Sequence, residues 1–529
     1  MRPARPGLLS FSLFIGAVFV ASALAAPSLP PASETGPPPL TYLPLVVREV
    51  APVTFTHGIA SGDVTSSTAQ LWTRLNHEAP LTLQVSQDPS FLTAVNFPNL
   101  LAPAGSDFTL QHEVEGLDAG QTYYYRWISG GVASPSGVFR TAPAPAALAD
   151  LRLTFSGDAD GTTPFWGDFS ALKAARLENS DFFVFLGDTV YSDSSLRPGG
   201  PAITLREYRD TYLKNLENTN LKDLLAASST YAIWDDHEVI NDWSGQNVDP
   251  TRFANGRQAF LEYMPIDEGQ FPADPGCAAD PLFRTFNWGA AADIVVLDER
   301  SCRSPKAEGA CTGPLGLDPA PTAPQDLRTQ FGFPIPPPAG CLAAINDPAR
   351  TVLGDVQKQL FKDFLLNSTA KYKLVINQVH IMQLYVYPYD RWEGFGAERL
   401  EILNFIRDNA IEGVIFLTTD LHANLMNEVF IDETTDPETI AYEFVTGPVA
   451  SLTLEQAIFN VLGQNGVDAV HNGLDSVGMD CRHLDAYSYG LVEIDASAGT
   501  ATITLKDENG AALEDQANPG TFCTLTLGP

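Results

Sequence analysis

Short apolar runs alternate with helical segments over most of the chain after residue 149. Runs such as LRLTFSG, DFFVFLGD, KLVINQVH and GVIFLTTD have the length and continuous hydrophobicity of strands buried on both faces. Amphipathic segments such as TLREYRDTYLKNL and DVQKQLFKDFLLN lie between them and predict helices. This succession predicts an α/β core, and the closing runs TIAYEFVTG, YGLVEIDAS and TATITLKD predict an antiparallel portion of it.

A different pattern precedes this core. Residues 51–142 carry short alternating runs, such as AQLWTRL and TYYYRWISG, separated by turn residues. Strands at this spacing predict a small β-sandwich. The segment PAPAALAD then links the sandwich to the core, and residues 303–345 form a Pro-rich insertion that we expect to be surface loop.

The N-terminus has the features of an export signal. Arg2 and Arg5 precede an apolar run, and the small residues Ala23 and Ala25 follow at cleavage spacing. We expect a signal peptide over residues 1–26, a Pro-rich linker over 27–50, and a mature protein that is extracellular or periplasmic. An uncleaved anchor helix is the alternative, since the run approaches the ~20 residues that span a bilayer. Later in the chain no stretch is long and apolar enough to span.

Six cysteines follow the signal, an even number that predicts up to three disulfides in an exported chain. We expect the pairs Cys302–Cys311, Cys277–Cys341 and Cys481–Cys523. The sequence contains no C-x-x-C pair, which argues against a structural zinc site.

The chain is strongly acidic. It has 64 Asp and Glu against 31 Lys and Arg, a formal net charge of −33. Such a charge repels a phosphate backbone and argues against a nucleic-acid-binding groove. We therefore expect a small-molecule substrate, and we expect the protein to be a monomer.

Acidic residues and histidines gather where the predicted strands end. They are Asp158 and Asp160 after LTFSG, Asp188 after FFVFLG, Asp235, Asp236 and His237 after YAIW, and Asp420 and His422 after VIFLTT. In open α/β sheets, ligands bind beyond the carboxyl ends of the strands, so these groups are expected to share one crevice. Because they repel one another unless cations neutralise them, the pattern predicts a two-metal hydrolytic centre.

Each motif also has a structural interpretation when it is taken alone. Asp188 after Gly187 is typical of a turn or a helix cap, and Asp420 with His422 is compatible with a loop pair. The string WDDHE is harder to explain in this way, because adjacent charged groups at a buried strand end are costly without a partner.

Several longer strings resemble the alkaline phosphatase D (PhoD-like) metallophosphatases. They are FTHGIASGDVTSSTAQLWTRL, FLGDTVYSD, IWDDHEVINDWSG, GRQAFLEYMP, FRTFNWGAAADIVVLDERSCRS, LGDVQKQLFKDFLLNSTAKYKLVINQVH and TDLHANLMNE, in the order expected of that family. The resemblance covers about residues 52–506. It implies a calcineurin-like four-layer αββα metallophosphatase core over residues 149–529, preceded by an all-β Ig/fibronectin-like sandwich.

The resemblance also implies an activity and a set of roles. It implies a phosphomonoesterase and phosphodiesterase that uses a ferric ion with calcium. Asp188 resembles the carboxylate that bridges the metals, Tyr191 the phenolate on iron, and Asp236 a further ligand. His237 resembles the residue that stabilises the transition state or protonates the leaving oxygen, and Asp420 with His422 matches the late ligand pair.

The sequence departs from the family pattern at the first strand end. Asp158 stands where the best-known members carry a cysteine ligand to iron. Asp158 and Asp160 are both candidate ligands, and a harder oxygen set weakens the expectation of iron and raises that of calcium, magnesium, manganese or zinc. His380 is either a third-strand metal ligand or a core histidine.

Arg300, Asn377 and Asn424 are weaker candidates for contacts with substrate phosphate. A guanidinium suits a phosphate well, and strand-end amides can donate to it. Structural ion pairs and turn caps are the competing explanations for these three residues.

The sequence therefore predicts a secreted phosphatase that hydrolyses monoesters or diesters with metal-activated water. One alternative is a diesterase that acts on phospholipids or teichoic-type polymers. Another is a non-catalytic extracellular binding protein stabilised by calcium. His237 and His422 favour catalysis, because a calcium cage is built from oxygen ligands.

Overall fold

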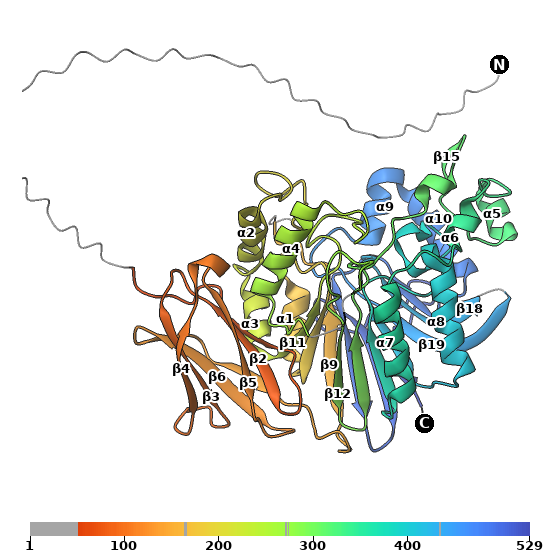
Figure 1. Ribbon diagram of the computed structural model, residues 1–529. Helices are drawn as coiled ribbons and strands as arrows, with labels where there is room; N and C mark the ends of the chain where they lie inside the picture. The colour runs from red at the N-terminus through yellow and green to blue at the C-terminus, as the bar shows by residue number, and fades with distance from the viewer. Residues whose placement is uncertain (1–50, 163–166, 270–271, 273, 433–434, 529) are drawn as a thin grey trace, which may run out of the picture. The chain divides into compact units, whose positions relative to one another are not determined.

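The computed structural model describes residues 51–162, 167–269, 272, 274–432 and 435–528 (Figure 1). Residues Pro52–Pro529 form one compact unit. The expected signal peptide, residues 1–26, and the expected linker, residues 27–50, lie outside the described residues.

A nine-stranded sheet forms the first layer of β-structure. Its order is β23 (Thr524–Leu527), β22 (Thr500–Asp507), β21 (Ser488–Asp495), β9 (Leu151–Ser156), β10 (Phe182–Leu186), β11 (Ser229–Ile233), β1 (Ile59–Gly62), β2 (Thr68–Arg74) and β5 (Thr109–Glu115). The central strands β9, β10 and β11 are parallel, so their carboxyl ends lie at the same edge. Strand β10 (FFVFL) is buried along its whole length, which explains its continuous apolar sequence.

A seven-stranded sheet forms the second layer. Its order is β12 (Arg284–Trp288), β13 (Ala292–Val296), β16 (Tyr372–Ile376), β17 (Val414–Thr418), β19 (Asp436–Val445), β18 (Asn424–Asp432) and β20 (Cys481–His483). Strands β13, β16, β17 and β19 are parallel to one another. The antiparallel strands lie toward the edges of both sheets, as the closing β-runs of the sequence predict.

The two sheets pack face to face and helices cover their outer faces (Figure 1). One core cluster joins side chains of both sheets, such as Phe155 and Ile376, to helices α1 (Ser170–Leu177), α2 (Leu205–Asn215), α3 (Thr219–Ala227) and α4 (Pro250–Tyr263). A second cluster joins the other side of the seven-stranded sheet to α7 (Gly354–Asn367) and α8 (Gly396–Asp408). This confirms the four-layer αββα prediction.

Local sequence explains where the helices begin. Thr204 and Glu207 form a capping box at the start of α2, and Asp249 caps α4 ahead of Pro250. The remaining helices are α5 (Gln325–Phe331), α6 (Cys341–Ile345), α9 (Leu454–Leu462) and α10 (Gln464–Ser476). Within the described ranges, none of the helices has the length and apolar content needed to cross a membrane.

The N-terminal β-sandwich shares a sheet with the core. Strands β4 (Val95–Leu101), β3 (Pro80–Ser86), β6 (Thr122–Ser129), β7 (Val132–Ala133) and β8 (Gly137–Arg140) form its separate sheet. This sheet packs through Leu83 and Trp127 against Leu71 of β2. Strand β1 runs parallel to β11, with Gly62 opposite Thr230. The nine-stranded sheet therefore contains strands from both sides of residues 142–149, although the sequence suggests a domain boundary there.

Three disulfides connect the six cysteines. The predicted pair Cys481–Cys523 is confirmed. The other two predicted pairs are wrong, because the structure joins Cys277 to Cys302 and Cys311 to Cys341. Cys302 lies in a turn against the loop of Cys277, where the Ala278 N–H donates to the Ser301 carbonyl at 2.8 Å. Spatial proximity therefore decides the pairing, whereas spacing along the chain suggested a different one.

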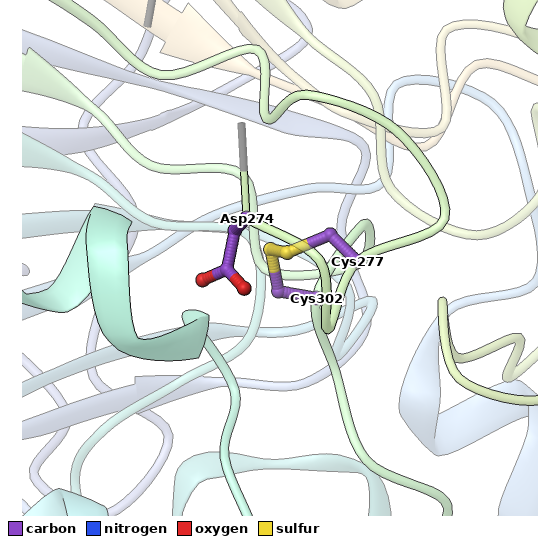
Figure 2. A group of neighbouring side chains, drawn as sticks. All are labelled: Asp274, Cys277 and Cys302. Atoms are coloured by element: carbon purple, nitrogen blue, oxygen red, sulfur yellow. A yellow bond between two sulfur atoms is a disulfide. The ribbon is translucent and has the colours of Figure 1, made fainter. Parts of the chain in front are cut away.

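One disulfide also accounts for a group of metal-type side chains. The ligand atoms of Asp274, Cys277 and Cys302 lie within 4.8 Å of one another. Figure 2 shows that the two sulfur atoms are bonded to each other beside the carboxylate. Because metal binding by cysteine needs a thiolate, this group is not a metal site.

The join between β1 and β11 leaves no room for a side chain at position 62. A Cβ at Gly62 would lie 2.1 Å from the Pro265 carbonyl oxygen and 2.6 Å from the Thr230 carbonyl oxygen. We predict that Gly62→Ala destabilises the protein by about 1–3 kcal/mol, because backbone atoms must shift. Thermal unfolding measures the effect, with Gly105→Ala as the control, since a Cβ at Gly105 meets nothing within 4 Å. Equal midpoints for the two variants would contradict this packing.

Candidate metal centre

The candidate ligands lie in the turns that follow the parallel strands. Asp158, Asp188 and Asp236 follow β9, β10 and β11, and Asp420 with His422 follows β17. Four of these five residues have positive φ, with values of 59° at Asp158, 48° at Asp188, 71° at Asp420 and 56° at His422. Each such conformation costs roughly 1–2 kcal/mol outside glycine. Strain concentrated at four residues of three neighbouring turns indicates a functional site.

One group of ligand atoms consists of Asp158, Asp188 and His422, within 4.8 Å of one another. His422 Nε2 lies 3.6 Å from Asp158 Oδ1 and 2.9 Å from the Tyr191 hydroxyl. His422 Nδ1 lies 2.6 Å from the Leu452 carbonyl oxygen and donates to it, since a carbonyl only accepts. This hydrogen bond fixes the tautomer and leaves the lone pair of Nε2 directed at the group.

A second group consists of Asp188, Asp236 and His237. His237 Nε2 lies 3.9 Å from Asp188 Oδ2 and 3.8 Å from Asp236 Oδ1. On the other side of the ring, His237 Nδ1 lies 2.6 Å from Asp193 Oδ1, and the ring stacks on Tyr191 with centroids 4.1 Å apart. Asp188 belongs to both groups and therefore lies where a bridging carboxylate is needed.

Both groups open into one pocket of about 220 Å³. Its lining includes Asp188, Asp236, His237, Asn241, Asp242, Asp420, Leu421, His422, Leu454 and Ala457. Asp420 Oδ2 lies 3.8 Å from Arg391 Nε at the rim. One wall of the pocket is therefore acidic and polar, whereas Leu421 and the α9 residues Leu454 and Ala457 are apolar.

Burial and mutual repulsion dominate the electrostatics of the site. Burial, together with the charges of Asp235 and Asp236, raises the pKa of Asp158 to about 7. The same causes raise the pKa values of Asp188 and Asp420 well above the usual range. Such groups keep their charge at neutral pH only with a compensating cation.

The two histidines respond to their surroundings in opposite directions. Burial lowers the pKa of His422 to about 4, which keeps its imidazole neutral, as a metal ligand requires. Burial also opposes protonation of His237, but the carboxylates of its three aspartate neighbours outweigh it and raise the pKa of His237 well above its usual value.

These residues fit metal ions. Asp158 Oδ1 is buried and has no hydrogen-bond partner among the described residues, although it faces His422. Its other oxygen accepts from the Thr419 hydroxyl at 2.5 Å. Carboxylate, imidazole and phenol groups around an unsatisfied buried oxygen form a donor set that hard and borderline cations accept.

The backbone packs tightly behind Asp158. Gly447 has φ of 109°, and a Cβ there would lie 2.5 Å from Asp158 Oδ2. Only glycine fits both the backbone conformation and the space at this position. Gly447 thus lets the loop after β19 press against the candidate ligand.

Several predicted site residues lie outside these groups. Asp160 Oδ1 accepts from the Thr162 backbone N–H at 2.8 Å and from its hydroxyl, an arrangement typical of a turn. His380 is 1% exposed, and neither ring nitrogen has a hydrogen-bond partner in the described ranges. Burial and the charges of Arg391 and Arg399 lower the pKa of His380 well below its usual value. The structure brings neither residue into the metal-type groups of the described chain.

The two asparagines are held in buried hydrogen bonds. Asn377 donates to the Val379 carbonyl at 2.6 Å and accepts from the Trp392 indole at 3.0 Å. Asn424 donates to the His483 carbonyl and accepts from the Thr446 hydroxyl. Both amides are fully buried and their partners are groups of the protein. The sequence suggested contacts with substrate phosphate for these two residues.

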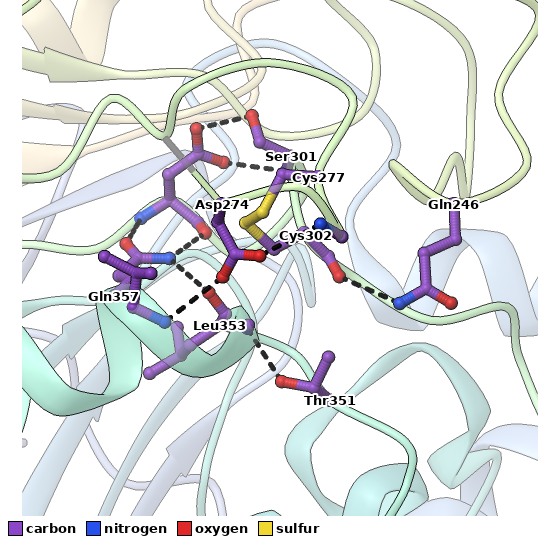
Figure 3. The surroundings of a disulfide bond; sticks show 12 residues. Gln246, Asp274, Cys277, Ser301, Cys302, Thr351, Leu353 and Gln357 are labelled. Carbon is purple, nitrogen blue, oxygen red and sulfur yellow. Dashed lines mark hydrogen bonds between the residues drawn. A yellow bond between two sulfur atoms is a disulfide. The ribbon is translucent and has the colours of Figure 1, made fainter. Parts of the chain in front are cut away.

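Arg300 is also fully buried, and it pairs with carboxylates behind the pocket. Its guanidinium contacts Asp235 at 2.6 Å, Asp390 at 2.8 Å and Asp236 at 3.5 Å. The segment just after it is held as well, since Gln246 donates to the Cys302 carbonyl beside the disulfide (Figure 3). Arg300 therefore holds Asp235 and Asp236 in position. The sequence suggested a contact with substrate phosphate for this residue.

A third acidic group, Asp236, Asp242 and Asp390, is explained by ion pairs. Lys306 contacts Asp242 at 2.7 Å, and Arg300 contacts Asp390. These cations supply the positive charge that a metal would supply elsewhere.

Sequence reasoning missed Asp193 and Asp390. Asp193 stands in the quoted string FLGDTVYSD, two residues after Tyr191, but nothing in the sequence indicates that it faces His237. Asp390 comes from a loop between β16 and α8, and no periodic signal places that loop beside Arg300.

Comparisons with known proteins identify related families and folds. A family model described as PhoD-like phosphatase matches residues 155–505, and one described as PhoD-like phosphatase, N-terminal domain, matches residues 43–143. The chain is 29% identical over 435 residues to alkaline phosphatase D of Bacillus subtilis (strain 168), a match that covers 75% of this chain and 69% of that protein.

Solved structures share the fold. A structure of PhoD matches with a TM-score of 0.70 at 24% identity, over 89% of this chain and 90% of that one. A purple acid phosphatase from seeds of yellow lupin (Lupinus luteus) matches with a TM-score of 0.54 at 10% identity, over 89% of this chain and 73% of that one.

The role of Arg300 can be tested directly. We predict that Arg300→Met destabilises the protein by about 3–5 kcal/mol, because it leaves buried carboxylates without their cation. Thermal unfolding measures the loss, and Arg407→Met is the control, since the ion pairs of Arg407 lie near the surface and are worth about 0–1 kcal/mol. A raised KM with an unchanged melting temperature would instead favour direct contact with substrate.

Proposed function

This chain belongs to the PhoD-like phosphatase family, and we propose that it is an exported, metal-dependent hydrolase of phosphate monoesters or diesters. The observation that carries the proposal is one pocket in which two ligand groups share Asp188 while His237 faces both carboxylates of the second group. An oriented imidazole that lies next to a cation-binding cluster suits phosphoryl transfer to water.

Export is supported by the predicted signal peptide and by the pairing of all six cysteines in disulfides. Disulfides persist in oxidising compartments outside the cytosol. We therefore place the mature enzyme outside the cytoplasmic membrane.

We propose that the pocket binds at least two metal ions. Asp158, Asp188, Tyr191 and His422 would hold one ion, and Asp188, Asp236 and Asp420 would hold the other. The resemblance to the family suggests Fe(III) with Ca²⁺, whereas the carboxylate of Asp158 in place of a thiolate suits Ca²⁺, Mg²⁺, Mn²⁺ or Zn²⁺. When bound, such ions activate water and neutralise charge on the phosphoryl oxygens.

Side chains of the protein orient the groups in the pocket and supply the proton for the leaving group. Asp193 accepts from His237 Nδ1 and holds the ring, so that Nε2 points into the pocket. His237 Nε2 donates its proton to the departing ester oxygen. Tyr191 stacks on this ring and restricts its rotation, while its hydroxyl contacts His422. The Leu452 carbonyl holds His422 from behind.

Metal removal tests the function. Chelated protein is expected to lose turnover of p-nitrophenyl phosphate and bis(p-nitrophenyl) phosphate, and re-metallation is expected to restore it. Asp158→Asn should reduce the number of ions found by elemental analysis, whereas the matched variant Asp160→Asn should retain them. Failure of the fully metallated protein to hydrolyse either ester would overturn the proposal in favour of a binding protein.

The role of His237 has a separate test. We predict that His237→Gln lowers kcat by roughly 10²–10⁴-fold with the metal content unchanged, as expected for loss of a general acid. Asp193→Asn should lower kcat by about 10–100-fold through misorientation of the ring. His471→Gln is the control, because that ring pairs with Glu455 outside the pocket. A kcat of His237→Gln equal to that of the control would contradict the assignment.

A further inference from the structure

Glu238 is a buried carboxylate that the proposed reaction does not use. It ends the string WDDHE, directly after His237, and it is fully buried. Its side chain accepts three hydrogen bonds, and the donors are two backbone N–H groups and one hydroxyl, none of which carries a charge. Burying a carboxylate against neutral partners costs free energy, and such costs cluster at functional sites.

The hydrogen bonds of Glu238 join two turns that carry candidate metal ligands. Its Oε1 accepts from the backbone N–H and from the hydroxyl of Thr189, each at 2.6 Å. Its Oε2 accepts from the backbone N–H of Asp235 at 2.9 Å. Thr189 follows Asp188 in the turn after β10, and Asp235 precedes Asp236 in the turn after β11. One carboxylate therefore sets the separation of these two turns.

The bond to Thr189 also holds the backbone of Asp188. The Thr189 N–H belongs to the peptide plane that joins these two residues, so fixing this N–H fixes ψ of Asp188. Asp188 has φ of 48°, a conformation that a residue other than glycine keeps only when its surroundings enforce it. From the other side, Asn215 Nδ2 donates to the Thr189 carbonyl and to the Ala159 carbonyl in the turn after β9, each at 2.8 Å. The turn that carries Asp188 is therefore fixed from two sides.

The second of the joined turns carries the proposed proton donor. His237 stands between Asp236 and Glu238, and its backbone N–H donates to Asp188 Oδ1 at 3.1 Å. Its imidazole lines the pocket, with Nε2 at 3.9 Å from Asp188 Oδ2. A shift of this turn relative to the first moves the imidazole relative to the candidate bridging carboxylate. A misplacement of about 1 Å can lower a rate by roughly 10²-fold.

We propose that Glu238 is a positioning residue, which holds His237 in register with Asp188 by joining their two turns. The inference rests on the proposed function and adds a residue that acts on the same site without touching substrate. Glu238 offers only acceptors to the three donors that converge on it. Glutamine cannot replace it, because the glutamine NH2 group donates and would face one of these N–H groups.

The acidity of the leaving group tests this role. Because p-nitrophenol is a stronger acid than phenol, p-nitrophenyl phosphate depends less than phenyl phosphate on a proton donated to the departing oxygen. At saturating metal, we expect Glu238→Gln to lower kcat for phenyl phosphate by about 10–100-fold. We expect a smaller loss for p-nitrophenyl phosphate, so the ratio of the phenyl to the p-nitrophenyl kcat falls severalfold. Loss of metal or partial unfolding removes active enzyme and leaves this ratio unchanged.

Glu398→Gln is the matched control for this experiment. Glu398 is also buried, at 2% exposed, and it accepts from the Val352 and Leu353 N–H groups at 3.2 and 3.0 Å. These groups lie outside the turns that carry the candidate ligands. The control should lose stability, since it breaks buried hydrogen bonds, but it should retain the ratio of the wild-type protein.

Thr189→Val is a milder second variant. It removes the hydroxyl that donates to Glu238 and retains the Thr189 N–H and the shape of the side chain. We expect the ratio to fall in the same direction as in Glu238→Gln, by a smaller factor. This variant decides the question if Glu238→Gln does not fold.

The outcomes separate this inference from the proposed function. A wild-type ratio in folded Glu238→Gln, or in Thr189→Val where Glu238→Gln does not fold, overturns the inference alone. An equal fall of the ratio in Glu398→Gln also overturns it. No turnover of either ester by the metallated wild-type protein overturns the proposed function and the inference together.

Discussion

Repulsion between carboxylates at the carboxyl ends of the strands is the constraint around which this molecule is built. Parallel strands bring Asp158, Asp188 and Asp236 together, and burial denies them the screening of water. Arg300 offsets part of the charge from behind by pairing with Asp235 and with Asp236. The remaining charge faces the pocket, where His237 offsets part of it and a bound cation would balance the rest. The protein thus pairs Asp235 with a fixed cation and leaves carboxylates such as Asp188 available to metal.

Much of this arrangement could be predicted from sequence, because the end of a buried strand is a local signal. The apolar run FFVFLG followed by Asp188 identifies both a strand and the direction in which its carboxylate lies. The same rule could not separate Asp158 from Asp160, since both follow one strand and only the backbone conformation of the turn decides between them. At Asp158 the backbone is left-handed and the carboxylate meets His422, whereas Asp160 caps its own turn.

Contacts made by loops were beyond sequence reasoning. Asp193 reaches His237, and Asp390 reaches Arg300, through chain paths that carry no periodic pattern. The cysteines show the same limit. Cys302 and Cys311 are close in sequence, but each has its partner elsewhere because Cys311 packs with Cys341, Ile345 and Tyr389 in a separate small cluster. The two explanations for Arg300 stayed open for a related reason, since a buried guanidinium and a substrate-binding one look alike in a sequence.

The parallel join between β1 and β11 has a consequence for the order of assembly. Strand β1 leaves the ribosome long before β11, yet it pairs with that strand at Gly62 and Thr230. Folding from the N-terminus outward can therefore complete the separate sheet of the sandwich but must hold the edge of β1 open until the middle of the chain arrives. An open strand edge invites pairing with other chains. The first strand that the protein makes thus keeps one edge open until strand β11 pairs with it.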